Sequence, residues 1–391
     1  MGFPQRLSAA QLDDRIDALS YRGGPRPEGA VFEYAFERKA DPGSPLDGIV
    51  SGYRGWTQSG KAAVKAALAE IAAVIDVTFR PVRDGREADF KFFRADDLGG
   101  SNGYGSFRYV GDDWDGYVAM RSDSDRDHGL LMHEIGHALA LKHPGNYGGA
   151  PRPYLPSRED TTDLTVMSYT EGRHDPATPM IYDVAALQAR WGANESAHLG
   201  RTRWTAPETG EAMTIWDAGG RDRIVHRGAA DAVVDLREGA FSSLGAPRDV
   251  SIAYGTVIED AKGGGGDDRL TGNEARNVLK GAGGDDALRG GGRGDRLIGG
   301  AGDDVLDGQG GADRLKGGAG LDEFRYARGG GADRILDFAE GETVVITKVK
   351  GFAQLTISDE GGDAHVTARG VDLTFVGVAA ETLDAGDFQF A

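Results

Sequence analysis

The segment from Gly263 to Arg325 decides the fold of the second half of the chain, because one nine-residue pattern repeats through it. Its frames read GGGGDDRLT, GNEARNVLK, GAGGDDALR, GGGRGDRLI, GGAGDDVLD, GQGGADRLK and GGAGLDEFR, in register and without an insertion. The eighth position of each frame is apolar: Leu270, Leu279, Leu288, Leu297, Leu306, Leu315 and Phe324. One inward side chain per turn predicts a narrow stacked core, whereas a flexible Gly/Asp-rich linker would not keep such a fixed position.

The sixth position of each frame carries an oxygen ligand after glycines that permit tight turning: Asp268, Asn277, Asp286, Asp295, Asp304, Asp313 and Asp322. Calcium takes about six to eight oxygen ligands, so carboxylates and carbonyls of neighbouring turns can share one ion. The pattern matches the known RTX calcium repeat, which implies a parallel β-roll with the six aspartates as calcium ligands. Asn277 and Arg293 depart from the pattern, so the turns they touch are the weakest ion sites. Without calcium we expect the segment to be largely unfolded.

The repeat has two flanking regions. Upstream, WDAGGRDRI (Trp216 to Ile224) resembles an isolated turn of the same kind with Asp217 and Asp222 as possible ligands, although a simple turn fits as well. Downstream, the short alternating segments VVITKV, AQLTIS, DAHVTA and VDLTFVGV predict an antiparallel β-sandwich end.

The first half contains three histidines in eleven residues, within DRDHGLLMHEIGHALALKHPG (Asp125 to Gly145). On a helix His133 and His137 lie one turn apart on one face, and Pro144 with Gly145 ends the helix so that His143 can turn back to them. Three neutral imidazoles with one open position describe a catalytic zinc site, where the ion lowers the pKa of its water to about 7. Glu134 lies beside them, placed to act as general base rather than ligand.

A second element follows at Thr165 to Tyr169, TVMSY, which is typical of the methionine turn beneath such sites. Met167 is either this floor or an ordinary core residue, and Tyr169 is either close to the metal or an ordinary half-buried tyrosine. The remaining histidines have no spacing partner and are expected at the surface: His128, His174, His198, His226 and His365. The segment Thr57 to Ile75 has helical spacing and predicts a core-packing helix.

Composition excludes several classes of protein. The chain of 391 residues has 62 acidic and 44 basic residues, and its net charge of −18 argues against nucleic-acid binding as the main activity. It has no cysteine, so disulfides, thiolate zinc sites and a cysteine nucleophile are excluded. No apolar run reaches the roughly 18 residues of a membrane span, and the first residues lack the apolar stretch of a secretory signal.

The ordered motifs HEIGHALALKHPG, LTVMSYT, TPMIYDVAALQARWGAN, TIWDAGGRDRI and the seven nonapeptides resemble the serralysins, secreted metzincin metalloendopeptidases. The likeness covers roughly Val50 to the C-terminus. It implies zinc on the three histidines, Glu134 as general base, and Tyr169 as a zinc-proximal residue that can ligate at rest and then bond the oxyanion. It also implies type I export through an uncleaved C-terminal signal, which Asp387 to Ala391 fits loosely, with Gln389 intruding.

Two departures from the family pattern concern the protease part. The pattern H-E-x-x-H-x-x-G-x-x-H has glycine where this chain has Ala140, which should cost about 1 kcal/mol if that residue is left-handed. The segment Met1 to Tyr21 is either a removable pro-segment or a helix docked through Leu12, Ile16 and Leu19, and we favour docking or disorder.

The sequence therefore predicts an α+β metzincin-type zinc protease domain over residues 1–199, followed by an all-β calcium-binding domain over 200–391 with a C-terminal secretion signal. We expect a secreted, extracellular, monomeric zinc endopeptidase. Its expected partners are peptide substrates, which the edge strand GSFRYV could pair with, and the type I secretion machinery; a proteinaceous inhibitor stays open. The alternatives are a calcium-dependent adhesion protein with an inactive metal site, and a zinc hydrolase of non-protein amides or esters.

Overall fold

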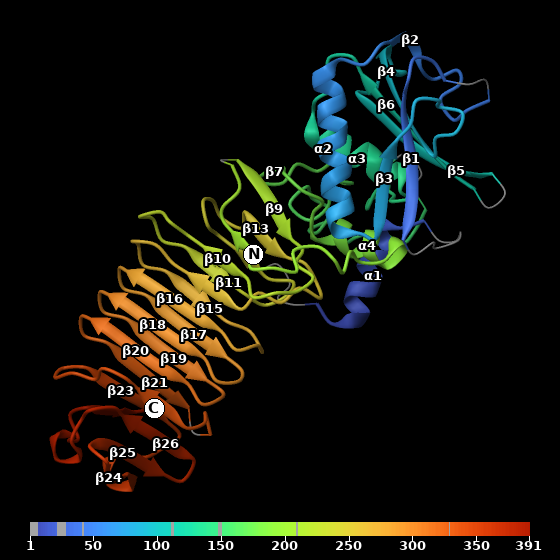
Figure 1. Cartoon of the computed structure of the whole chain (residues 1–391). Helices are drawn as coiled ribbons and strands as arrows, with labels where there is room; N and C mark the ends of the chain where they lie inside the picture. Colours follow the sequence, from blue (N-terminus) through green and yellow to red (C-terminus); the bar gives the residue numbers. More distant parts are fainter. Residues whose placement is uncertain are drawn as a thin grey trace. The chain divides into compact units, whose positions relative to one another are not determined.

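The computed structural model describes residues 7–21, 29–40, 43–110, 113–147, 151–208, 210–327 and 329–391. The chain forms two compact units (Figure 1). The first comprises Met1–Ala197 with Pro207–Ala218, and the second comprises His198–Ala206 with Gly219–Ala391. The chain therefore crosses the boundary between the two units three times, after residues 197, 206 and 218.

The first unit is built on a mixed sheet in the order β3-β1-β4-β6-β5, with β2 paired to β4. Its strands are β1 (Ala30–Glu37), β2 (Ser51–Arg54), β3 (Val77–Pro81), β4 (Phe90–Asp97), β5 (Gly103–Val110) and β6 (Asp113–Arg121). The central strand β4 pairs parallel with β1 and β6 and buries Phe90, Phe92 and Phe93, as a strand covered on both faces does. The last strand, β5, is antiparallel to β6.

Four helices belong to this unit: α1 (Ala9–Leu19), α2 (Gln58–Val74), α3 (His128–Ala138) and α4 (Ile181–Trp191). The prediction of a core-packing helix from Thr57 is confirmed, because Thr57 caps α2 by accepting from the Gly60 backbone N–H at 2.9 Å. Asp127 caps α3 in the same way through the Leu130 N–H. Among the described residues, none of the helices has the length and apolar character needed to cross a membrane.

The N-terminal segment is docked in the structure from residue 7 onward, whereas residues 1–6 lie outside the described residues. Leu19 is fully buried, and Leu12 and Ile16 are half-buried. The Arg15 guanidinium donates to both carboxylate oxygens of Glu159, at 2.7 and 2.9 Å. The chain after α1 then bonds the loop after α3, because the Tyr21 N–H donates to the Ala140 carbonyl at 3.1 Å.

The second unit is dominated by two parallel sheets that the chain visits alternately (Figure 1). Sheet A contains β8 (Arg203–Trp204), β10 (Arg223–Val225), β14 (Asp260–Lys262), β16 (Val278–Gly283), β18 (Arg296–Ala301), β20 (Arg314–Ala319) and β22 (Asp333–Ile335). Sheet B contains β11 (Val233–Asp235), β15 (Arg269–Thr271), β17 (Ala287–Gly291), β19 (Val305–Gln309), β21 (Glu323–Ala327), β23 (Thr343–Thr347) and β27 (Phe388–Phe390).

The nonapeptide register explains this coil. Leu279, Leu297 and Leu315 are aligned on successive strands of sheet A, and Leu288 and Leu306 are aligned in the same way on sheet B. All seven apolar positions of the repeat are at most 1% exposed. Two nonapeptides therefore make one full coil, with a single ladder of side chains from each sheet filling its core.

The C-terminal end differs from the expected antiparallel sandwich, because its strands extend the two sheets of the coil. Strands β24 (Thr356–Glu360), β25 (Asp363–Ala368) and β26 (Val371–Phe375) pair antiparallel, as expected. The segment VVITKV instead forms β23 and continues sheet B parallel to β21, and β26 pairs parallel with β22, so that β24 to β26 extend sheet A. The expectation was wrong there because alternating burial does not distinguish a parallel from an antiparallel partner.

Smaller elements complete the two units. The first unit contains the parallel pair β7 (Asp175–Pro176) and β9 (Glu211–Ile215). The second contains the antiparallel pair β12 (Phe241–Ser242) and β13 (Val250–Ile252), and the short 3-10 helices Phe352–Gln354 and Ala380–Thr382.

The coil core gives a first prediction. We expect Leu297→Ala to lower the free energy of unfolding of the second unit by about 2–5 kcal/mol, because it leaves a cavity between two stacked leucines. Ile298→Ala on the half-buried outer face of the same strand is the matched control and should cost about 1 kcal/mol or less. Urea unfolding followed by circular dichroism measures both, and equal losses would contradict the stacked core.

Candidate metal centres

Three imidazoles converge at the end of α3. The helix places His133 and His137 one turn apart, and Ala140 then turns the chain back with a φ of 68°. The His143 Nε2 atom lies 3.2 Å from the Nε2 of His133 and 3.0 Å from that of His137. All three possible ligand nitrogens lie within 4.8 Å of one another, so the histidines that the sequence singled out are gathered at one point.

Backbone carbonyls fix which nitrogen of two of these rings carries the proton. The His133 Nδ1 lies 2.7 Å from the Val166 carbonyl oxygen, and the His137 Nδ1 lies 3.0 Å from that of Leu141. Because a carbonyl can only accept, both Nδ1 atoms donate and both Nε2 atoms keep a lone pair. Outer partners of this kind are typical of metal-binding histidines.

Burial keeps the three rings neutral. Desolvation lowers the pKa of His133, lowers that of His137 well below its usual range, and lowers that of His143 to about 4. At neutral pH the Nε2 lone pairs of His133 and His137 therefore both face the Nε2 of His143, which lies 3.2 and 3.0 Å away and can donate a hydrogen bond to only one of them. This donor set of neutral imidazole nitrogens fits a zinc ion.

Glu134 lies on α3 next to His133 and is only 5% exposed. Desolvation raises the pKa of its carboxyl to about 8, against the lowering effect of a hydrogen bond from the Gly105 backbone. Strand β5 can approach it only through glycines: a Cβ at Gly103 would lie 2.5 Å from the Glu134 Oε1, and one at Gly105 2.1 Å from the Glu134 carbonyl oxygen. Sequence reasoning missed these glycines, although their alternation on a strand was a visible signal.

The turn from Thr165 to Met167 lies beneath α3. Met167 is fully buried, and a Cβ added at Gly136 would lie 2.7 Å from its sulfur. Asp183, at the start of α4, accepts from the Thr165 hydroxyl at 2.5 Å and from the Val166 N–H at 2.7 Å. Sequence reasoning missed Asp183, whose pKa burial raises to about 7. Asp183 therefore fixes Val166, whose carbonyl orients the His133 ring.

Tyr169 lies on the solvent side of the imidazoles. Its ring centre is 5.3 Å from that of His133 and 4.5 Å from that of His143, yet the residue is 62% exposed. An ordinary half-buried tyrosine would not be so open. Asp160 holds the segment that carries Tyr169, because it accepts hydrogen bonds from the Ser168 and Tyr147 hydroxyls at 2.6 Å each.

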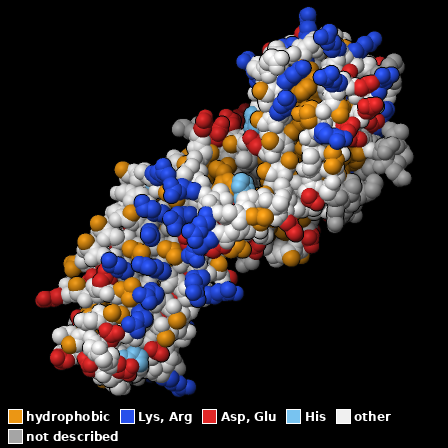
Figure 2. Space-filling model, in the orientation of Figure 1, with side chains coloured by type: hydrophobic (Ala, Val, Ile, Leu, Met, Phe, Trp, Pro, Cys, Tyr) orange, Lys and Arg blue, Asp and Glu red, His pale blue; other side chains and the backbone are white. Residues whose placement is uncertain are grey.

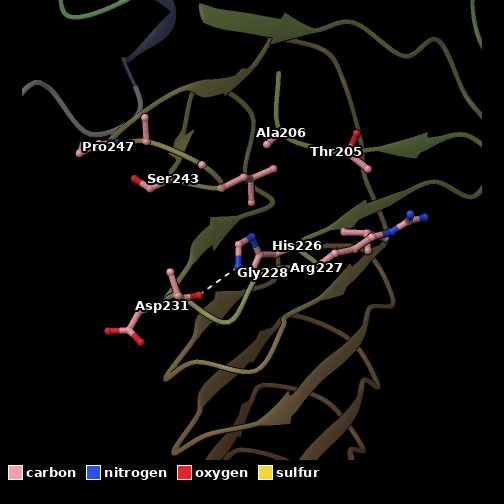
Figure 3. A pocket seen from close by; sticks show the side chains of 13 residues that line it. Thr205, Ala206, His226, Arg227, Gly228, Asp231, Ser243 and Pro247 are labelled. Atoms are coloured by element: carbon pink, nitrogen blue, oxygen red, sulfur yellow. Dashed lines mark hydrogen bonds between the residues drawn. The ribbon is translucent and has the colours of Figure 1, made fainter. Parts of the chain in front are cut away.

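The other histidines do not all lie at the surface. His198 is exposed, and His128, His174 and His365 are half-buried. His226 is only 7% exposed, so the surface expectation was wrong for this residue. It lines a cavity of about 590 Å³ in the second unit, where its Nε2 donates to the Ala230 carbonyl at 3.0 Å (Figure 3). This hydrogen bond within one turn explains why the His226 ring is buried.

The aspartates of the repeat are buried in the turns of the coil. One oxygen of each bonds the previous coil; for example, the Asp286 Oδ1 accepts from the Asp268 N–H at 2.8 Å. The other oxygen, Oδ2, is buried without a hydrogen-bond partner in Asp286, Asp295, Asp304, Asp313 and Asp322. Buried carboxylate oxygens without partners are costly, so these atoms fit a cation.

Turn carbonyls supply further oxygens at the same places. A Cβ added at Gly290 would lie 2.4 Å from the Asp295 Oδ2 and 2.6 Å from the Gly308 carbonyl oxygen. Two oxygens from neighbouring coils therefore meet where glycine leaves space. This combination of carboxylate and carbonyl oxygens suits calcium.

The ends of the ladder vary. Asp268 satisfies its Oδ2 with the Gly264 N–H, and Asn277 donates from Nδ2 to the Glu259 carbonyl, so neither leaves the same open oxygen. Asp222 bonds the Thr202 N–H and has an unpartnered Oδ2, as in the repeat. Asp333 extends the ladder by bonding the Asp313 N–H. Sequence reasoning missed Asp333 because it follows 20 residues after Asp313, although ADRIL echoes ADRLK.

A family model and several curated relatives indicate one family. Residues 191–359 match the family model described as Peptidase M10 serralysin C terminal. Serralysin G of Dickeya chrysanthemi is 33% identical over 64% of this chain and 61% of its own length. The serralysin of Photorhabdus laumondii is 32% identical over 71% and 65%, and the metalloprotease AprA of Pseudomonas entomophila is 31% identical over 56% and 54%. The chain belongs to the serralysin family, and it spans less than two thirds of the length of these relatives.

The turn after α3 gives a second prediction. Ala140 is a non-glycine residue in the left-handed region, which costs about 1–2 kcal/mol. We expect Ala140→Gly to change the free energy of unfolding by less than about 1 kcal/mol, because relief of strain offsets the lost methyl group. Ala186→Gly, at an equally buried position inside α4, should destabilise by about 1–2 kcal/mol. Thermal unfolding compares them, and a larger loss at position 140 would contradict this.

The buried aspartates give a third prediction. In the calcium-free fold, desolvation raises the pKa of Asp286, Asp295, Asp304 and Asp313 from 3.8 to about 7. The folded chain then binds more protons than the unfolded chain between about pH 4 and 7, so stability falls as pH rises through that window.

With chelator present, the strand signal in circular dichroism should therefore weaken from pH 5 to pH 7, and added calcium should restore it. Asp304→Asn should make the calcium-free pH dependence shallower, whereas Asp359→Asn at an exposed position of β24 should not. A strand signal that strengthens with rising pH in chelator would refute the assignment.

Proposed function

We propose that this chain is a secreted zinc-dependent endopeptidase of the metzincin type, with residues 1–199 as the protease domain and 200–391 as the calcium-binding domain. The observation that carries the proposal is the convergence of three imidazole nitrogens beside a buried carboxylate. His133, His137 and His143 would hold the zinc ion. A zinc ion bound there supplies a Lewis acid that activates water and polarises a carbonyl.

Glu134 acts as the general base of the proposed reaction. Its carboxylate takes the proton of the attacking water and passes it to the leaving amine. A pKa raised by burial suits both steps, because the group can accept and then release a proton near neutral pH. The Gly105 N–H keeps the carboxylate oriented during the exchange.

Tyr169 stabilises the oxyanion that forms from the substrate carbonyl in the proposed reaction. Its ring lies against His133 and His143 on the open side of the site, so its hydroxyl can reach the carbonyl oxygen of a bound substrate. Hydrogen bonds to that oxygen strengthen as negative charge develops, which favours the transition state over the substrate. Met167 has no polar role and supports α3 from below.

The substrate is proposed to be an extended peptide. Strand β5 ends the sheet order, is antiparallel to β6, and passes Glu134 at Gly103 and Gly105. A peptide that adds to such an edge gains backbone hydrogen bonds whatever its side chains are. This supports a protease over a hydrolase of small amides or esters.

The second unit is proposed to bind calcium through the Oδ2 atoms of its buried aspartates. Extracellular calcium modules bind at about 10⁻⁴–10⁻³ M, so the sites would fill only outside the cell. Folding of the coil would then confine activity to the exterior and assist type I export. A proteinaceous inhibitor is a further possible partner of the protease site.

A substitution at Glu134 tests the enzyme directly. We expect Glu134→Gln to lower the rate of casein hydrolysis by about 10²–10⁴-fold because the base is lost. One equivalent of zinc should remain by elemental analysis, whereas His143→Ala should lose it. Glu171→Gln on the surface is the matched control and should retain wild-type activity. Equal and negligible hydrolysis by all variants and the wild type would favour the adhesion protein with an inactive site.

A further inference from the structure

The outer face of sheet A carries a band of basic side chains (Figure 2, over β10 to β20). We call this band, with the arginines at its N-terminal end, the cationic face. Its members are Arg201, Arg203, Arg221, Arg223, Lys262, Lys280, Arg296, Arg314, Lys316 and Arg334. The chain as a whole has a net charge of −18, so this band is a local reversal of its sign.

Strand register stacks like charges on top of one another. Arg296, Arg314 and Arg334 are aligned on three successive strands, and Lys262 and Lys280 are aligned on two. Neighbouring strands lie about 4.8 Å apart, so aligned cations repel one another. Their buried neighbours Leu297 and Leu315 point inward, which leaves the charged side chains on the outer face.

Acids relieve part of this repulsion only at the two ends of the band, where Asp260 pairs with Arg221 and Arg223 and Asp363 pairs with Arg334 at 3.1 Å. The cations in the middle of the band make no ion pair with another described residue, although acids outnumber bases in the chain. They are Lys262, Lys280, Arg296, Arg314 and Lys316. Sheet B is built differently. There, Arg325 pairs with Glu323, and Asp307 is aligned with Arg289 and Arg325. The unbalanced charge is therefore specific to one sheet.

A hollow of about 360 Å³ lies at the N-terminal end of the cationic face. It is lined by Arg201, Thr202, Arg203, Arg221, Arg223, Asp260 and Val278. Asp260 accepts from the guanidinium groups of Arg221 and Arg223 at 2.9 Å each, which orients both. Four arginines and one carboxylate leave a net positive hollow, and guanidinium forks match carboxylate and sulfate groups.

We propose that the cationic face binds a linear acidic polysaccharide, with its carboxylate or sulfate groups along sheet A and one end in the arginine hollow. The band is at most two outward residues wide on each strand, and it spans seven strands, on the order of 30 Å. A narrow and long cationic surface fits one extended chain with a charge on each sugar.

Two other polyanions fit less well. The outward residues of β16 and β18 include Val278 and Ile298 but no aromatic ring, which single-stranded nucleic acids use for base stacking. None of the exposed large hydrophobic residues lies on the strands of sheet A, so an anchor in a lipid surface is not provided there.

The test uses the calcium-loaded full chain and two triple variants with the same net charge. The first is Arg296→Gln/Arg314→Gln/Lys316→Gln on sheet A, and the control is Arg269→Gln/Arg289→Gln/Arg325→Gln on sheet B. Titration calorimetry measures binding to polygalacturonate and to heparin at about 0.15 M salt. We expect binding that the sheet A variant weakens about tenfold or more and the control changes about twofold or less. Arg201→Gln/Arg203→Gln should weaken it as well.

Calcium titrations by circular dichroism show whether each variant folds as the wild type does. Three results would overturn the proposal: no binding to either polysaccharide, equal weakening by the two triple variants, or tighter binding to an oligothymidylate or to phosphatidylserine vesicles than to both polysaccharides. The last result would assign the face to nucleic acid or to a membrane.

Discussion

Buried ligand atoms that converge with too few hydrogen-bond donors among them are the constraint on which both units depend. In the first unit, the Nε2 atoms of His133 and His137 keep lone pairs that both face the Nε2 of His143, at 3.2 and 3.0 Å. In the second, buried aspartate oxygens lack partners along the turns of the coil. Both arrangements are costly without a cation, and the donor atoms of each fit one.

The surroundings of the imidazoles show how such an arrangement is kept. Asp183 holds Val166, and Val166 holds His133 through its carbonyl. The left-handed turn at Ala140 lets Leu141 hold His137 and returns His143 to the helix. The N-terminal segment bonds the same turn through Tyr21, so residues far apart in the chain share the support of one site.

The sequence predicted those features that arise from local spacing. The histidines at i and i+4, the cap of α2 and the apolar ladder of the coil all follow from periodicity within one element. Asp183, Gly103 and Gly105 could not be found in this way, because their roles depend on contacts between segments that are distant in sequence. The parallel pairing of β23 and the burial of His226 were misjudged for the same reason.

Asp333 is a different kind of miss. The nonapeptide frame advances in steps of nine residues. Two additional residues before Asp333 take this aspartate out of the frame, although the coil continues in space. A parallel ladder tolerates such an insertion at a turn, because only the strand positions must align. The end of a repeat in sequence is therefore not the end of the coil.

The most direct test of the central claim is X-ray absorption at the zinc edge of the zinc-loaded full chain. The account predicts three imidazole nitrogens at about 2.0–2.1 Å with at least one further oxygen ligand, and loss of this signature in His143→Ala. A first shell without imidazole, or a zinc signature that His143→Ala leaves unchanged, would contradict it.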